Sequence, residues 1–229
     1  MCIRDSVDTG GEEIIASWGG AVSLPTGAQT IDFVSTSTND DSGGTGMNSI
    51  VIYGVDQNYE EITEVLTLDG TTTVTTTNTF YGVNRVVPFL CGSTKNNVGT
   101  ITGTQTTSGI TVAEIPATLC STQQCIFYCQ AKHVFIASYI TVNAVKLSGG
   151  GGNPLVTIRG YVYSPVANAN IQVFKTKIDT QIENTVQITP EEPFPITEKS
   201  TLYFTAETDV NNTSVDLRFG GIDFKQSDA

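Results

Sequence analysis

The chain has 229 residues, enough for one large or two small domains, and 35 of them are threonine, a β-branched residue that favours strands. Its 23 acidic and 11 basic residues give a net charge of -12, so we expect no nucleic-acid partner, because binding a phosphate backbone needs clustered cations. No apolar run approaches the ~20 residues of a membrane-spanning helix, so we expect no membrane partner either.

The first residues differ in style from the rest of the chain. Met1–Ser6 (MCIRDS) resembles the translated read-through of a sequencing adapter at the start of metagenomic reading frames, and we set it apart from the fold. On this interpretation the natural chain extends further upstream. Residues 7–24, which contain the only tryptophan, are expected to connect that missing N-terminal region to the first domain.

From residue 25 to residue 118, short β-rich runs alternate with turn signals at the spacing expected of a β-sandwich. Alternation in one of these runs places Ile62, Glu64 and Leu66 on the same face, and Asp69-Gly70 after it is a strong hairpin signal. The expected strands of this N-terminal domain are Gln29–Ser35, Asn48–Tyr53, Glu61–Leu68, Thr71–Thr77, Tyr81–Leu90 and Gly99–Gln105.

Residues 119–229 repeat this style with an unrelated sequence. Gly149–Gly152 predicts a flexible loop, and Glu191–Ile196 (EEPFPI) predicts an extended connector, because proline disfavours a helical residue before it. The expected strands are Gln124–Cys129, Val134–Val142, Leu155–Tyr163, Ile171–Ile178, Thr201–Glu207 and Ser214–Phe224. We therefore predict an all-β fold of two tandem antiparallel β-sandwich domains, with a jelly roll as one topology that fits either domain.

Three cysteines and the only histidine, Cys120, Cys125, Cys129 and His133, have side chains that can ligate zinc. The spacing argues against a zinc site, because Cys125 and Cys129 on one strand stand about 13 Å apart at ~3.3 Å per residue. We expect the cysteines to act as small buried hydrophobic residues and leave a disulfide open, with Cys91 as one partner. Catalysis by a nucleophile with His133 is disfavoured, since no serine lies in a nucleophile elbow.

Two acidic loops contain the oxygen ligands that calcium prefers, and the weak candidates are Asp40, Asp41, Asp56 and Glu60. Neither loop matches an EF-hand, and exposed turns in which an Asp side chain bonds the nearby backbone explain the same composition. We therefore expect no metal, no cofactor and no catalytic residue. Acidic pairs such as Glu191-Glu192 leave a glycosidase as a remote alternative, and carbohydrate binding without catalysis is favoured over it.

The order of segments carries a resemblance. The run Val34–Val87, followed by the turn-rich Cys91–Gln105, resembles a widespread group of tailed-phage and marine-virus virion proteins with a typical "TGxxxVxIxGLDxxYxExxETVTLNGTT" segment. The matching residues are Thr45, Gly46, Gly54, Asp56, Tyr59, Glu61, Leu68, Gly70, Thr71 and Thr72, with Val55 for Leu and Asp69 for Asn as departures. Pro193–Phe224 resembles the group's closing segment, whereas Gln130–His133 replaces its usual Pro-Ala-Gly-Lys turn.

The resemblance covers about residues 8–224 and implies a non-enzymatic virion structural protein, as a head decoration, fibre or tail component located in the virion. It implies other virion proteins as partners and self-association as a homo-oligomer, a trimer by analogy with phage fibres. The alternative is a carbohydrate-binding or adhesive β-sandwich module on a phage or bacterial surface, with a host surface glycan as partner.

Overall fold

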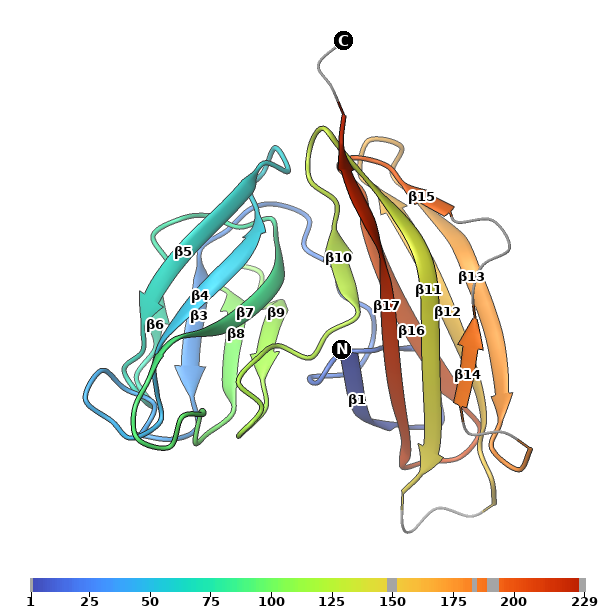
Figure 1. The fold of residues 1–229 in the computed structure, drawn as a ribbon, viewed down its shortest axis with the longest axis horizontal. Coiled ribbons are helices and arrows are strands. Elements are labelled where there is room, and N and C mark those ends of the chain that lie inside the picture. Colours follow the sequence, from blue (N-terminus) through green and yellow to red (C-terminus); the bar gives the residue numbers. More distant parts are fainter. Residues whose placement is uncertain (1, 148–151, 183–184, 189–193, 227–229) are drawn as a thin grey trace. The chain divides into compact units, whose positions relative to one another are not determined.

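The computed structural model describes residues 2–147, 152–182, 185–188 and 194–226. These residues form small antiparallel β-sheets and no helix, so the all-β prediction is confirmed and no helix among them could cross a membrane. The chain divides into two compact units (Figure 1). We call Ser23–Gln123 the central unit, and Met1–Val22 together with Gln124–Ala229 the terminal unit.

The central unit contains a four-stranded sheet and a three-stranded sheet. The first has the order β6 (Val74–Thr75), β3 (Ile31–Ser35), β8 (Ile101–Gln105), β9 (Thr111–Ile115), and the second has the order β5 (Glu61–Thr67), β4 (Met47–Val55), β7 (Gly82–Cys91). One apolar cluster includes Phe33 and Ile101 of the first sheet and Ile52 and Val86 of the second. Alternation along each strand therefore directs one face of both sheets into a common core.

The terminal unit contains two five-stranded sheets (Figure 1). In one, β1 (Cys2–Val7), β17 (Thr213–Lys225), β11 (His133–Lys146) and β14 (Thr185–Ile188) follow in order, and β15 (Phe194–Ile196) also pairs with β11. In the other, the order is β10 (Ile126–Tyr128), β16 (Thr201–Thr208), β12 (Leu155–Ser164), β13 (Ala169–Asp179), and β2 (Glu13–Ile14) also pairs with β16.

Aromatic rings connect these two sheets through one core. Phe204 of β16 is fully buried, and its ring centroid lies 5.2 Å from that of Phe219 on β17 and 6.3 Å from that of Phe174 on β13. Phe127 of β10 lies 4.8 Å from Phe135 of β11 in the same way. Such ring pairs add to the stabilisation that apolar burial supplies. These aromatic contacts therefore help to hold the two sheets together.

The N-terminal residues take a larger part in the fold than the sequence suggested. Instead of a connector over residues 7–24 after a separate segment 1–6, β1 pairs with β17 and β2 pairs with β16. Ile14 and Ile15 are buried in the terminal unit, and burial of such side chains explains why this short segment is drawn into the sheet. The predicted division 25–118 and 119–229 thus differs from the observed central unit, Ser23–Gln123.

A turn forms at Asp69-Gly70, with one antiparallel bridge between Asp69 and Thr72. The predicted hairpin of the flanking strands is wrong, because β5 and β6 belong to different sheets. The Gly70 carbonyl accepts a hydrogen bond from the Ser35 N–H at 3.0 Å, and the Gly70 N–H donates to the Asp40 carbonyl at 2.8 Å. These hydrogen bonds hold the segment that connects the two sheets. Of the predicted connecting segments, residues 149–151 and 191–193 lie outside the described residues, and residues 194–196 form β15.

Candidate functional site

Asp40, the first calcium candidate, is fully buried, and both of its carboxylate oxygens accept hydrogen bonds. Oδ1 accepts from the N–H groups of Met47 at 2.9 Å and Val98 at 2.8 Å. Oδ2 accepts from the Gly99 N–H at 2.8 Å and from the Ser35 hydroxyl at 2.7 Å. A calcium ion would need the lone pairs of these two oxygens, and four hydrogen-bond donors already use them. Asp40 therefore connects loops of the central unit and is not placed to bind calcium.

The other three calcium candidates lie in two exposed turns. Asp41 Oδ1 accepts from the Gly43 N–H at 2.7 Å, and Asp56 Oδ1 accepts from the N–H groups of Asn58 at 2.8 Å and Glu60 at 2.9 Å. These are Asp side chains that close short turns on their own backbone. The structure does not group these acids into a cluster that could bind a metal anywhere in the part of the chain that it describes.

The cysteines and His133 belong to different surroundings. Cys120 lies in the central unit, whereas Cys125, Cys129 and His133 lie in the terminal unit, and none of the four cysteines after residue 90 is in a disulfide. Burial raises the pKa of the Cys129 thiol to about 11, so it is protonated at neutral pH. The His133 ring Nδ1 lies 2.7 Å from a carboxylate oxygen of Asp223 instead of facing a thiol.

An apolar row, which we call the apolar face, crosses the outer side of the β5-β4-β7 sheet in the central unit, among the outward polar residues Glu61, Thr63 and Thr67 of β5. Strand register places Val65, Val51 and Val87 in one row across it, and Tyr53 lies in the next row beside Arg85. Val65 is 50% exposed and Tyr53 is 38% exposed, whereas Val51 between its neighbours is buried at 8%. A hollow of 540 Å³ opens beside this row, and its lining residues are Tyr53, Arg85, Val87, Pro88, Leu119, Cys120 and Ser121. Exposed apolar groups gathered in this way mark interaction surfaces.

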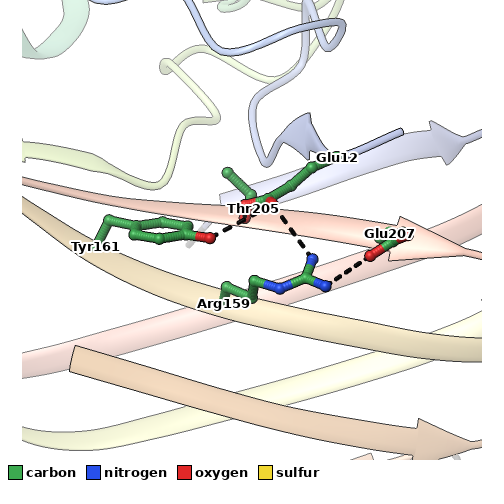
Figure 2. Close-up of polar contacts among 5 residues, drawn as sticks. All are labelled: Glu12, Arg159, Tyr161, Thr205 and Glu207. Atoms are coloured by element: carbon green, nitrogen blue, oxygen red, sulfur yellow. Dashed lines mark hydrogen bonds and ion pairs between the residues drawn. The ribbon is translucent and has the colours of Figure 1, made fainter. Parts of the chain in front are cut away.

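A polar face covers the outer side of β12, β13 and β16 in the terminal unit, and Figure 2 shows its central network. The Arg159 guanidinium donates to Glu207 at 2.6 Å and to Glu12 at 3.3 Å. Glu12 also accepts from the Tyr161 hydroxyl at 3.4 Å and from the Thr205 hydroxyl. Alternation explains the gathering, because these strand residues all point away from the core side of the sheet.

The contacts of this network shift the pKa values of Tyr203 and Arg159. Burial, followed by the nearby Tyr161 and Glu12, raises the pKa of the Tyr203 phenol to about 12. Its ring stacks on that of Tyr161, with centroids 5.3 Å apart. The hydrogen bond that Arg159 donates to Glu207 raises the pKa of Arg159. At neutral pH Arg159 is therefore charged and Tyr203 is neutral.

A pocket of 240 Å³ adjoins this network, and its lining residues are Leu155, Thr157, Arg159, Lys175, Lys177, Glu207, Thr208 and Asp209. This site was not predicted from the sequence. Its signal was the alternation of Thr157, Arg159 and Tyr161 along one strand and of Lys175 and Lys177 along the next. Only the register, which places Arg159 opposite Lys175 and Thr157 opposite Lys177, brings the two sets together.

Comparisons with protein-family models, with curated proteins and with solved structures find no match to this chain. The resemblance to virion proteins therefore stays a prediction.

Proposed function

We propose that this protein is a non-enzymatic structural component of a phage virion, as a head decoration, fibre or tail protein, which associates with other virion proteins and with copies of itself. The observation that carries the proposal is the apolar face on β5-β4-β7, since an assembly component must offer its partners an apolar surface to bury. The segment order of Val34–Val87 and Pro193–Phe224 supports the same class.

We further propose that each unit is a β-sandwich. In support, each unit has two antiparallel sheets, and one apolar cluster draws side chains from both of them. Rings of Phe204 and Phe219 meet between the two sheets of the terminal unit. A jelly-roll connection of the strands is one topology consistent with this arrangement.

Mass spectrometry of density-purified virus particles tests the assignment to the virion, with the tryptic peptides Val86–Lys95 and Ser200–Arg218 as markers. Copy numbers near that of the major capsid protein would support a decoration protein, and a few copies per particle would support a fibre or tail component. Peptides found with cells and absent from particles would overturn the proposal.

Light scattering after size exclusion tests the role of the apolar face. We expect the purified chain to form oligomers and the double variant Val65→Ser, Leu119→Ser to dissociate, because both side chains are about half exposed in the monomer. The matched control is Val166→Ser, Ile182→Ser, which replaces two exposed apolar residues in the terminal unit. Equal dissociation of both variants, or a monomeric parent chain, would contradict this role.

Carbohydrate binding is the second candidate function, and the polar face of the terminal unit favours it. Sugars are recognised by hydrogen bonds from charged groups beside apolar ring surfaces. This face combines Arg159 and Glu207 with the partly exposed ring of Tyr161, which stacks on the buried Tyr203. A glycan array probed with the full chain tests it, and Arg159→Gln is expected to lower the signal. Lack of binding to every glycan would remove this candidate.

A further inference from the structure

Basic side chains gather on one part of an otherwise acidic protein. Only 11 of the 229 residues are Lys or Arg, yet Arg159, Lys175 and Lys177 line the same 240 Å³ pocket. Arg159 and Lys175 are directly opposite each other on neighbouring strands. Like charges in that position destabilise a sheet, so folding alone does not favour this placement.

The acidic groups of the pocket already have partners. Glu207 accepts from Arg159 at 2.6 Å, and Asp209 Oδ1 accepts from the Leu155 N–H at 2.8 Å. Lys175 and Lys177 are exposed, and neither forms an ion pair with another residue in the described part of the chain. The donors still available in the pocket include these two ammonium groups and the N–H groups of Arg159 that are not bonded to Glu12 or Glu207. Glu207 and Asp209 retain lone pairs that can accept further bonds.

These groups match one class of ligand. We propose that the pocket binds an acidic saccharide, whose carboxylate accepts hydrogen bonds from Lys175 and Lys177 and whose hydroxyls donate to Glu207 and Asp209. A volume of 240 Å³ is below the about 300–1,000 Å³ typical of sites for drug-sized ligands, which suits a single sugar residue. This inference rests on the second candidate function, carbohydrate binding, and names its site and ligand class.

Isothermal titration of the full chain with a galacturonic acid oligosaccharide tests the inference, with the matching neutral galactose oligosaccharide and inorganic phosphate as the other probes. We expect binding of the acidic oligosaccharide to weaken at least tenfold in Lys175→Gln, Lys177→Gln. The control variant Lys146→Gln, Lys225→Gln changes two lysines of the β11-β17 sheet and is expected to bind as the parent does. Circular dichroism of both variants verifies that they fold.

Equal binding of the acidic oligosaccharide by the two variants would overturn this site and leave carbohydrate binding in place. Binding of the neutral oligosaccharide alone would overturn the ligand class while carbohydrate binding stands. If inorganic phosphate bound as tightly as the acidic oligosaccharide, the pocket would be a general anion site and the proposal of a saccharide would fail. A chain that binds none of the three probes overturns the inference, and a glycan array then decides separately on carbohydrate binding.

Discussion

The outer face of β5-β4-β7 in the central unit and the outer face of β13-β12-β16 in the terminal unit follow the same alternation but present different chemistry. The first carries a row of Val65, Val51 and Val87, and the second carries Arg159 opposite Lys175. Alternation determines which side chains face outward. Whether those side chains are apolar or charged depends on what the face contacts. This contrast supports the proposals of a protein partner for the apolar face and of a small polar ligand for the polar face.

The two units also use carboxylates differently. Asp40 of the central unit is fully buried with four donors around it, whereas the side chains of Glu12 and Glu207 in the terminal unit are 32% and 46% exposed beside Arg159. A buried carboxylate contributes to folding because its donors would otherwise be left unpaired. Partly exposed ion pairs contribute little to folding and remain accessible to a ligand.

The largest expected loss of stability follows from removal of the Phe204 ring in the core of the terminal unit. Phe204→Ala should lower the free energy of unfolding of that unit by about 3–5 kcal/mol, because the ring packs against both sheets and its removal leaves a cavity. The fluorescence of Trp18, the only tryptophan, reports on this unit during urea unfolding. Phe89→Ala, at a side chain 65% exposed in the central unit, is the control and should leave this transition unchanged.

The next effect falls on the central unit. Asp40→Asn should lower its stability by about 2–3 kcal/mol, since an amide nitrogen replaces one of the two acceptors that four donors share. Hydrogen exchange at the amides of Val98 and Gly99 should accelerate. Asp41→Asn is the matched control, because asparagine closes the same turn to Gly43. Stabilisation of the parent chain by added calcium would contradict the structural role given to Asp40.

Parts of this comparison could be predicted from the sequence. Threonine content and alternation gave the all-β class, and the pattern of residues 61–68 correctly put Ile62, Glu64 and Leu66 on one side of β5. Glu64 on that side accepts from the N–H groups of Thr77 at 2.7 Å and Asn78 at 2.9 Å. The threonine run at 71–77 forms only the two-residue β6, because strand propensity does not provide a neighbouring strand to pair with.

The candidate sites were less predictable. The acidic loops contain weak candidates for calcium sites because Asp and Glu are calcium ligands by type. The sequence does not reveal that backbone N–H groups donate to both carboxylate oxygens of Asp40. The polar face of the terminal unit depends on contacts between residues far apart in the chain, such as Glu12 and Arg159. Such contacts require the strand register, which local pattern does not determine.

A smaller effect should appear only in alkali. The Tyr203 phenol has a pKa raised from 10.0 to about 12 in the folded protein, so the unfolded chain loses this proton first. Its contribution to stability is complete below pH 10 and falls as the pH rises to 12, by roughly 2 kcal/mol at that point. The difference between the parent chain and Tyr203→Phe in unfolding free energy should follow this curve.

The smallest effect concerns the ion pairs of the polar face. Arg159→Gln should lower the stability of the terminal unit by about 1 kcal/mol at low salt, because the partners Glu12 and Glu207 are partly solvated and solvent screens their attraction. High salt should shrink the difference, which urea unfolding at two ionic strengths measures. Lys177→Gln should stay within about 0.5 kcal/mol of the parent, since that lysine is exposed. A salt-independent loss of several kcal/mol on Arg159→Gln would instead make the network part of the core, and the contrast with Asp40 would disappear.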